Sequence, residues 1–167
     1  MIRKNNLPIF LLLTVALLIS FVSCKKDNNL EKEEEALIQE YLNSNNTLDF
    51  ELKPSGLYFL ETLAGTGIVP APHDTAYIMY TGKFLNEATF RTNVGTTDTL
   101  IVPFYEDEWL ITGLQEGITY MIEGGKAQFL LPSKLAYGAM GSYPYINGYT
   151  PLLFDVELVK VVPGPGK

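Results

Sequence analysis

The sequence predicts an α+β fold, in which an antiparallel sheet packs against one short helix. Segments rich in β-branched and aromatic residues, most of them alternating with period two, recur beyond Pro54. Only one later segment, which begins near Thr112, has convincing helical spacing. Turn residues separate these segments. Strands that outnumber helices in this way favour a single sheet with a helix on one face.

Length and composition are those of one globular domain. The chain has 167 residues and 47% hydrophobic content, which is enough for an ordinary core. Its 19 acidic against 12 basic side chains argue against a nucleic-acid partner, since phosphate binding needs clustered Lys and Arg. A single cysteine and a single histidine, His73, leave no ligand set with metal spacing, so we expect no metal site.

Residues 1–23 are interpreted as a lipoprotein signal peptide. Arg3 and Lys4 precede an apolar run from Leu7 to Val22, as in signal peptides. A transmembrane anchor is the alternative, although a run of roughly 16 residues is shorter than the about 20 that span a bilayer. The segment Val22-Ser23-Cys24 resembles the end of a bacterial lipobox, in which the cysteine becomes the lipidated first residue.

Lipidation of Cys24 predicts a membrane partner and a location in the bacterial cell envelope. The chain's one cysteine lies where such a lipoprotein needs it, and buried acyl chains contribute about 0.8 kcal/mol per CH2 to attachment. We expect the anchor in the outer membrane, periplasmic or surface-facing. Residues 24–53 are predicted to be a lipidated tether followed by a short helix.

That helix is predicted over about residues 29–43. Four glutamates between positions 31 and 35 lie in its first turns, where the helix dipole favours anions. We interpret the acidic run as a solvated face, with a partner-docking surface as the alternative. The apolar stripe could pair with a second copy or dock on its own domain. The stripe consists of Leu30, Leu37, Ile38, Tyr41 and Leu42.

Five strands and a second helix are expected beyond Pro54. The helix is predicted to start at Thr112, which forms a Thr-x-x-Gln capping box with Gln115, and to stop at Gly124. Residues 163–167 form a Pro- and Gly-rich tail that ends the fold. The strands are expected at Gly56 to Leu63, Thr75 to Phe84, within Thr97 to Phe104, Lys126 to Leu131 and Leu152 to Val161.

A loop rich in glycine and tyrosine, residues 135–150, leads into the last strand. Large amphipathic tyrosine rings on a loop are typical of a binding surface. Alternate residues from Leu152 to Leu158 fall on one strand face and back this loop with apolar side chains. The sequence therefore predicts an apolar, aromatic pocket. No nucleophile is paired with a histidine base, which argues against hydrolytic chemistry.

Five ordered motifs resemble FKBP-type peptidyl-prolyl cis-trans isomerases. The resemblance covers about Pro54 to Val161 and implies a twisted antiparallel sheet wrapped around one short helix, in a domain spanning residues 54–162, with the N-terminal helix as an addition. The motifs are Met79-Tyr80-Thr81-Gly82, Gly113-Leu114-Gln115-Glu116-Gly117, Gly124-Gly125-Lys126, Leu135-Ala136-Tyr137-Gly138 and Thr150 to Leu158.

The resemblance implies an isomerase that rotates X-Pro amides in proline-containing segments of unfolded or exported proteins. The barrier to that rotation is about 18–20 kcal/mol. A dry aromatic pocket stabilises the twisted amide, which has a smaller dipole than the planar one. No cofactor is needed. A non-catalytic peptide-binding or chaperone module on the same fold and a structural envelope lipoprotein are the alternatives.

The resemblance also assigns the site residues. Tyr137 and the backbone N-H of Ile111 correspond to the donors to substrate carbonyls, and Phe90 and Tyr80 complete the catalytic set. For the apolar wall residues, ordinary core packing is the alternative. The substrate-binding set is Leu100, Leu110, Leu114, Ala136, Tyr145, Ile146, Phe154 and Arg91.

Two positions in this set depart from the family pattern. Arg91 stands where the family usually carries an aspartate, which reverses the local charge and predicts weaker catalysis. Leu114 stands where the best-known members have tryptophan, which predicts a wider pocket floor.

Overall fold

The computed structural model describes residues 29–104 and 110–165. The predicted signal peptide and Cys24 lie outside these residues. The chain divides into two compact units, residues 1–33 and 34–167. Within the described ranges, no helix has both the length and the apolar character needed to cross a membrane.

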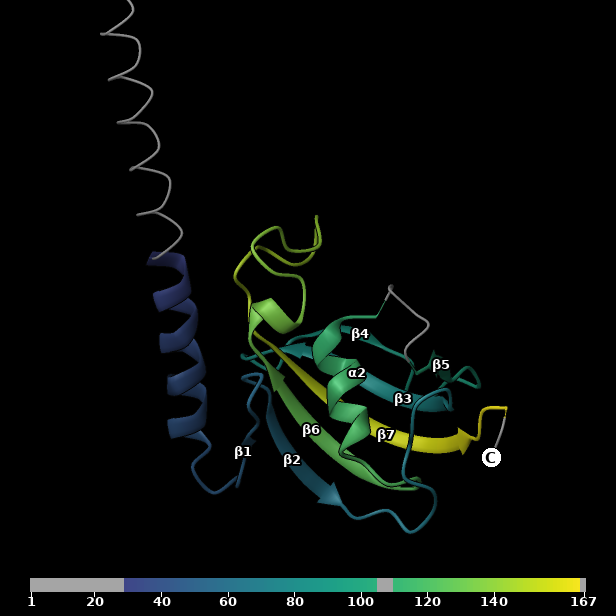
Figure 1. Cartoon of the computed structure of the whole chain (residues 1–167). Coiled ribbons are helices and arrows are strands. Elements are labelled where there is room, and N and C mark those ends of the chain that lie inside the picture. The colour runs from purple at the N-terminus through teal and green to yellow at the C-terminus, as the bar shows by residue number, and fades with distance from the viewer. Residues whose placement is uncertain (1–28, 105–109, 166–167) are drawn as a thin grey trace, which may run out of the picture. The chain divides into compact units, whose positions relative to one another are not determined.

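Seven antiparallel strands form one curved sheet (Figure 1). Their order is β1-β2-β6-β7-β3-β4, and β5 pairs with β3 beside this path. This confirms the predicted α+β class, although β1 (Glu51–Leu52) and β4 (Thr89–Thr92) are two short strands beyond the five that were expected. The strands are β1 Glu51–Leu52, β2 Tyr58–Leu63, β3 Thr75–Phe84, β4 Thr89–Thr92, β5 Leu100–Pro103, β6 Lys126–Leu131 and β7 Leu152–Val162.

Helix α2, Thr112–Thr119, lies against one face of the sheet (Figure 1). Gly117 allows this close approach, because a Cβ atom there would lie 2.5 Å from the Phe129 ring on β6. The predicted capping box is wrong. Ile111 is the N-cap residue and no side chain caps the helix, while the Thr112 hydroxyl donates to the Leu135 carbonyl at 3.4 Å.

The predicted helix end is also too late. The helix stops at Thr119, and Gly124 lies in the turn that leads into β6, where its φ of 83° suits glycine. Residues between them form turns rather than another helical turn, with the Met121 and Tyr120 amides bonded to carbonyls three residues back.

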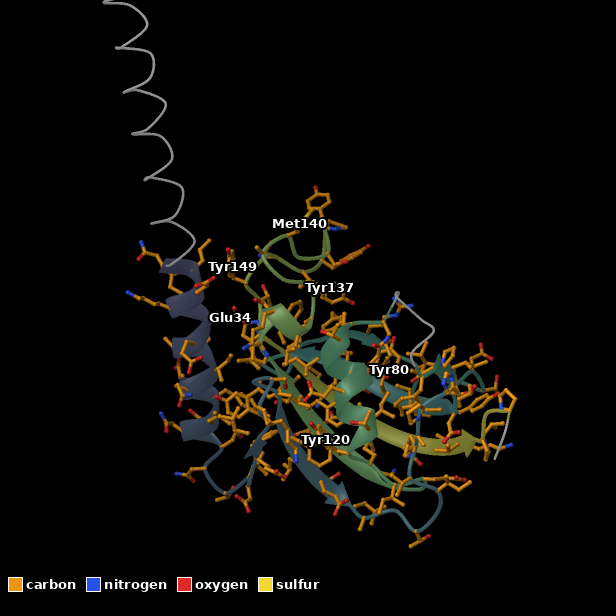
Figure 2. All side chains as sticks on the ribbon, viewed as in Figure 1. Glu34, Tyr80, Tyr120, Tyr137, Met140 and Tyr149 are labelled. Atoms are coloured by element: carbon orange, nitrogen blue, oxygen red, sulfur yellow. The ribbon has the colours of Figure 1, made fainter. Side chains whose placement is uncertain are left out.

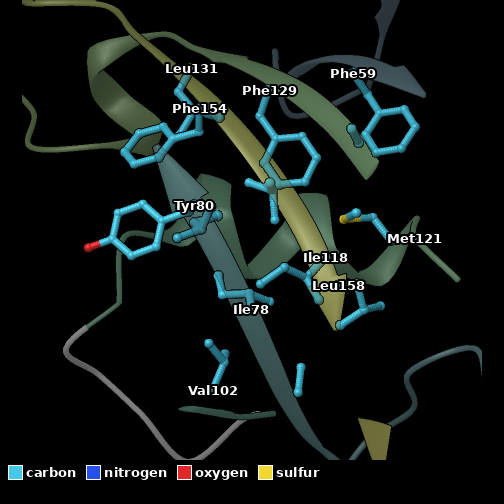
Figure 3. Close-up of a cluster of buried hydrophobic side chains, with 14 of the residues drawn as sticks. Phe59, Ile78, Tyr80, Val102, Ile118, Met121, Phe129, Leu131, Phe154 and Leu158 are labelled. Atoms are coloured by element: carbon cyan, nitrogen blue, oxygen red, sulfur yellow. The ribbon is translucent and has the colours of Figure 1, made fainter. Parts of the chain in front are cut away.

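The main core lies between α2 and the sheet (Figure 3). Phe129 is fully buried and stacks on Phe59, with ring centroids 5.6 Å apart. The predicted alternation of β7 is confirmed, because one face of that strand contributes four core residues. They are Leu152, Phe154, Val156 and Leu158.

The N-terminal helix, residues 29–44, packs from Glu34 onward on the other face of the sheet. Its Ile38 and Tyr41 join Leu130 of β6 and Leu153 of β7 in a second buried cluster. These strand residues alternate with those of the main core, as period two requires. Ile38, Tyr41 and Leu42 of the predicted stripe therefore dock on this domain, whereas Leu37 is 51% exposed.

The acidic run on this helix is solvated with one exception. The glutamates at 31, 33 and 35 are exposed as predicted, but Glu34 is only 8% exposed. The solvated-face interpretation is therefore wrong for Glu34, because the helix turns this side chain toward the protein and Ser133 supplies it with hydrogen bonds.

We expect the free energy of unfolding to fall at alkaline pH because of Tyr41. Burial, with the nearby Glu87 carboxylate adding to it, raises the pKa of Tyr41 from 10.0 to about 12. Between pH 10 and 12 the unfolded chain loses a proton that the folded chain retains, so stability falls as pH rises. The expected loss is about 2–3 kcal/mol. Urea unfolding from pH 9 to 12 measures it, and Tyr41→Phe should show a correspondingly shallower decline. Parallel curves for the two proteins would contradict the assignment.

Candidate active site

A pocket of about 190 Å³ opens where β3, β4 and β5 meet the start of α2 and the loop before β7. Four strands contribute to its wall, so its shape is set by the sheet. The turn before α2 and the first turn of that helix supply one side, and the loop after the 3-10 helix η1, Ser133–Leu135, supplies another. Its lining residues are Tyr80, Phe90, Arg91, Leu100, Leu110, Ile111, Leu114, Tyr137 and Phe154.

Aromatic rings form one side of this pocket. Phe154 on β7 meets Phe90 edge to face, with centroids 5.8 Å apart, and lies 6.2 Å from the Tyr80 ring. Gly82 makes room for this cluster, because a Cβ atom there would lie 2.6 Å from the Phe90 ring. Leu114 is 2% exposed and closes the pocket from the helix side. Packed aromatic and aliphatic side chains therefore form much of the wall, and Tyr80, Arg91 and Tyr137 also line the pocket.

The predicted donors lie on the side of the pocket formed by α2 and the loop. Ile111 immediately precedes α2, and its carbonyl accepts from the amide of Leu114 at 3.0 Å. No residue of the described ranges accepts from the Ile111 N-H, which leaves this donor available. Tyr137 follows η1, and Figure 2 shows it at the base of the long loop, with Met140 nearer the tip.

Tyr80 and Arg91 bring polar groups to the aromatic side. Burial raises the pKa of the Tyr80 hydroxyl above its ordinary value, Arg91 opposes that shift, and Tyr137 adds to it. Tyr80 is therefore neutral at physiological pH. Arg91 makes no ion pair with any residue in the described parts of the chain, whereas Lys53, Lys83 and Lys126 each do.

Three predicted substrate-binding residues do not line this pocket. Ala136 is half-buried against the main core, Ile146 is 5% exposed within it, and Tyr145 is 81% exposed. The reason is a tight reversal in the loop, where the amide of Ser142 donates to the Ile146 carbonyl at 2.8 Å and the reverse bond is 2.9 Å. This turn draws Ile146 inward and leaves Tyr145 in solvent, so a role for these residues stays a prediction.

The pocket has no acid, base or metal cluster among its described residues. Across residues 29–104 and 110–165 there is no group of three His, Cys, Asp or Glu side chains that could hold a metal ion. The arrangement can bind an apolar, kinked segment and donate hydrogen bonds to its carbonyl oxygens.

A family model for FKBP-type peptidyl-prolyl cis-trans isomerases matches residues 67–159. The chain belongs to this family. It is 36% identical over 106 residues to FK506-binding protein 4 of Dictyostelium discoideum, covering 64% of this chain and 28% of that protein. It is 32% identical over 111 residues to the FKBP-type isomerase FkpA of Escherichia coli, covering 66% and 40%.

Solved structures support the FKBP-type fold. The crystal structure of Escherichia coli FkpA has a TM-score of 0.69 and 27% identity, and the match covers 98% of this chain and 76% of that one. A peptidyl-prolyl cis-trans isomerase of Pseudomonas syringae has the same TM-score at 24% identity, covering 81% of this chain and 96% of that one. This FKBP-type chain spans between about a quarter and a half of the length of its curated relatives.

Proposed function

We propose that this FKBP-type protein is a peptidyl-prolyl cis-trans isomerase that acts on unfolded or exported proteins. The observation that carries the proposal is one pocket in which aromatic walls from β3, β4 and β7 face the Ile111 amide and Tyr137. Family membership supports the same reaction class. The pocket volume of about 190 Å³ leaves room for a proline ring.

The chemistry follows from the amide itself. The planar X-Pro bond resists rotation by about 18–20 kcal/mol because the nitrogen lone pair is delocalised. Twisting localises that lone pair and reduces the amide dipole, so walls such as Phe90 and Phe154 penalise the planar form more than the twisted one. The Tyr137 hydroxyl and the Ile111 N-H hold substrate carbonyls while the bond turns. No covalent bond to the protein forms.

A protease-coupled isomerisation assay on the soluble form that begins at Lys25 tests the proposal. The protein should accelerate the reaction, and Tyr137→Phe should lower kcat/KM about two- to twelvefold, because one hydrogen bond of about 0.5–1.5 kcal/mol is lost. Tyr143→Phe, at a tyrosine that is 94% exposed, is the matched control and should match wild type. Absence of any acceleration by wild type would refute isomerase activity.

A non-catalytic peptide-binding module is the second candidate, and Arg91 is the observation that favours it. Arg91 lines the pocket, and the family resemblance implies aspartate at this position. If only recognition remains, wild type should bind proline peptides in a calorimetric titration without accelerating isomerisation. Arg91→Asp should then gain activity. If the protein is an enzyme, wild type itself should accelerate isomerisation, and Arg91→Asp should accelerate it further.

We further propose that the protein is tethered to the bacterial cell envelope through lipidated Cys24. The N-terminal sequence pattern supports this proposal. Cys24→Ser is expected to move the protein from the membrane pellet to the soluble fraction after cell fractionation, because the acyl chains provide most of the attachment. A variant that still pellets with membranes, and is not released by high salt, would contradict a lipid anchor.

A further inference from the structure

Glu34 is a buried acid that the proposed reaction does not use. Its carboxylate accepts two hydrogen bonds from one residue, Ser133, whose backbone N-H donates to Oε1 and whose hydroxyl donates to Oε2 at 2.7 Å. Both side chains are nearly inaccessible, with Glu34 8% and Ser133 4% exposed. No Lys or Arg of residues 29–104 and 110–165 forms an ion pair with Glu34, so Ser133 alone supplies its described partners.

Ser133 in turn fixes the backbone around Tyr137. The Ser133 carbonyl accepts from the amides of Ala136 and Gly138, both at 2.8 Å. Tyr137 lies between these two amides, so its backbone position depends on where Ser133 is held. The φ of 61° at Gly138 marks the sharp turn that follows. Displacing Ser133 would therefore displace the Tyr137 hydroxyl in the pocket.

The same segment also contacts the first turn of α2. The Thr112 hydroxyl donates to the Leu135 carbonyl, and a Cβ atom at Gly113 would lie 2.9 Å from that oxygen. The loop after Ser133 thus packs against the residues next to Ile111. Ser133 reaches Ile111 only indirectly in this way, whereas its carbonyl bonds directly to the amides of both neighbours of Tyr137.

We propose that Glu34 is a positioning residue, which fixes Tyr137 through Ser133 and makes the N-terminal helix part of the functional unit. Figure 2 labels Glu34 on the helix and Tyr137 on the loop. The kinetic consequence rests on the proposed isomerase function. The structural consequence, a loosened Tyr137 backbone when Glu34 is removed, does not depend on activity.

A double-mutant cycle tests the kinetic consequence. Glu34→Leu should lower kcat/KM in the wild-type background by up to the two- to twelvefold loss expected for Tyr137→Phe, because it acts through the same hydroxyl. In the Tyr137→Phe background it should lower kcat/KM less than about twofold, because residues that act through one group are not additive. Glu34→Gln keeps an acceptor for the Ser133 N-H and should retain most of the activity. Glu40→Leu, at an exposed glutamate of the same helix, should match wild type.

Equal losses in the two backgrounds would overturn the positioning role and leave only a structural one. If Glu34→Leu does not fold, Ser133→Ala repeats the cycle, since it removes the hydroxyl donor and keeps the N-H. Ser133→Ala should lower kcat/KM less than Glu34→Leu does. The decrease should again appear only in the background that retains the Tyr137 hydroxyl.

Amide hydrogen exchange tests the structural consequence independently of isomerase activity. In Glu34→Leu, or in Ser133→Ala where the first variant does not fold, the Gly138 amide should exchange several-fold faster than in wild type. The Phe129 amide in β6 should be unchanged. An unchanged Gly138 amide would overturn the proposal. If wild type is inactive but the Gly138 amide exchanges faster in the variant, the isomerase function is refuted. The proposal that Glu34 positions the Tyr137 backbone through Ser133 is then still supported.

Discussion

Replacing Ile111 with proline is expected to lower kcat/KM about five- to 150-fold while the fold is retained. The substitution removes the one backbone N-H that we assign to a substrate carbonyl. A carbonyl left without its donor costs about 1–3 kcal/mol, and 1.4 kcal/mol is a factor of ten. The protease-coupled assay on the form that begins at Lys25 measures the change.

The local backbone already suits proline. Ile111 has φ of -58°, close to the about -65° that the proline ring imposes. It is the N-cap residue, so its N-H takes no part in the α2 hydrogen bonds, and its carbonyl still accepts from Leu114. Proline is well tolerated at helix starts for this reason. The thermal unfolding midpoint should therefore stay close to that of wild type.

Ile111→Ala is the matched control for this experiment. Alanine keeps the N-H and removes most of the side chain, so it reports the contribution of the pocket wall alone. The proline variant should be clearly less active than the alanine variant. Equal activity of the two would show that the N-H does not donate to the substrate in the rate-limiting step.

Short-range patterns and family motifs specify four of the pocket residues, and the family resemblance assigned the others one by one. Period two alone puts Phe154 on the core face of β7, and the structure places it there. The motifs then add Tyr80, Leu114 and Tyr137, which come from three separate segments. All nine residues that line the pocket were among the sequence predictions.

Features that depend on contacts between distant residues were not predictable from the sequence. Strand β4, Thr89–Thr92, is short and largely exposed, so it carries no alternation, and it forms because it pairs with β3. Glu34 is one of four nearby glutamates with the same local signals. Its burial is set by Ser133, which lies 99 residues away. No periodic pattern distinguishes such a residue from its neighbours.

In the glycine- and tyrosine-rich loop, residues 135–150, the burial of neighbouring residues was also not predictable. Tyr145 and Ile146 are adjacent and both apolar in character, yet one is exposed and the other is buried. The hydrogen bonds between Ser142 and Ile146 decide this, and a loop without a repeating pattern gives no means to predict them.

Replacing Phe129 with alanine is expected to lower the free energy of unfolding by about 3–5 kcal/mol, as for other large buried rings. The ring is fully buried, stacks on Phe59 and fills the space that Gly117 leaves between α2 and β6 (Figure 3). Rigid strands on both sides prevent the sheet from closing over the cavity. Urea unfolding measures the loss, with an unchanged m-value if the unfolded chain is unaffected.

Met140→Ala is the control, because Met140 is 93% exposed. This substitution should change the free energy of unfolding by less than about 0.5 kcal/mol. A loss below about 1 kcal/mol for Phe129→Ala would mean that α2 can settle into the cavity. Such a collapse would carry Ile111 and Leu114 with the helix and deform the pocket. The same variant would then lose isomerase activity while keeping its stability, so the two measurements together show whether Phe129 holds the helix at its working distance from the sheet.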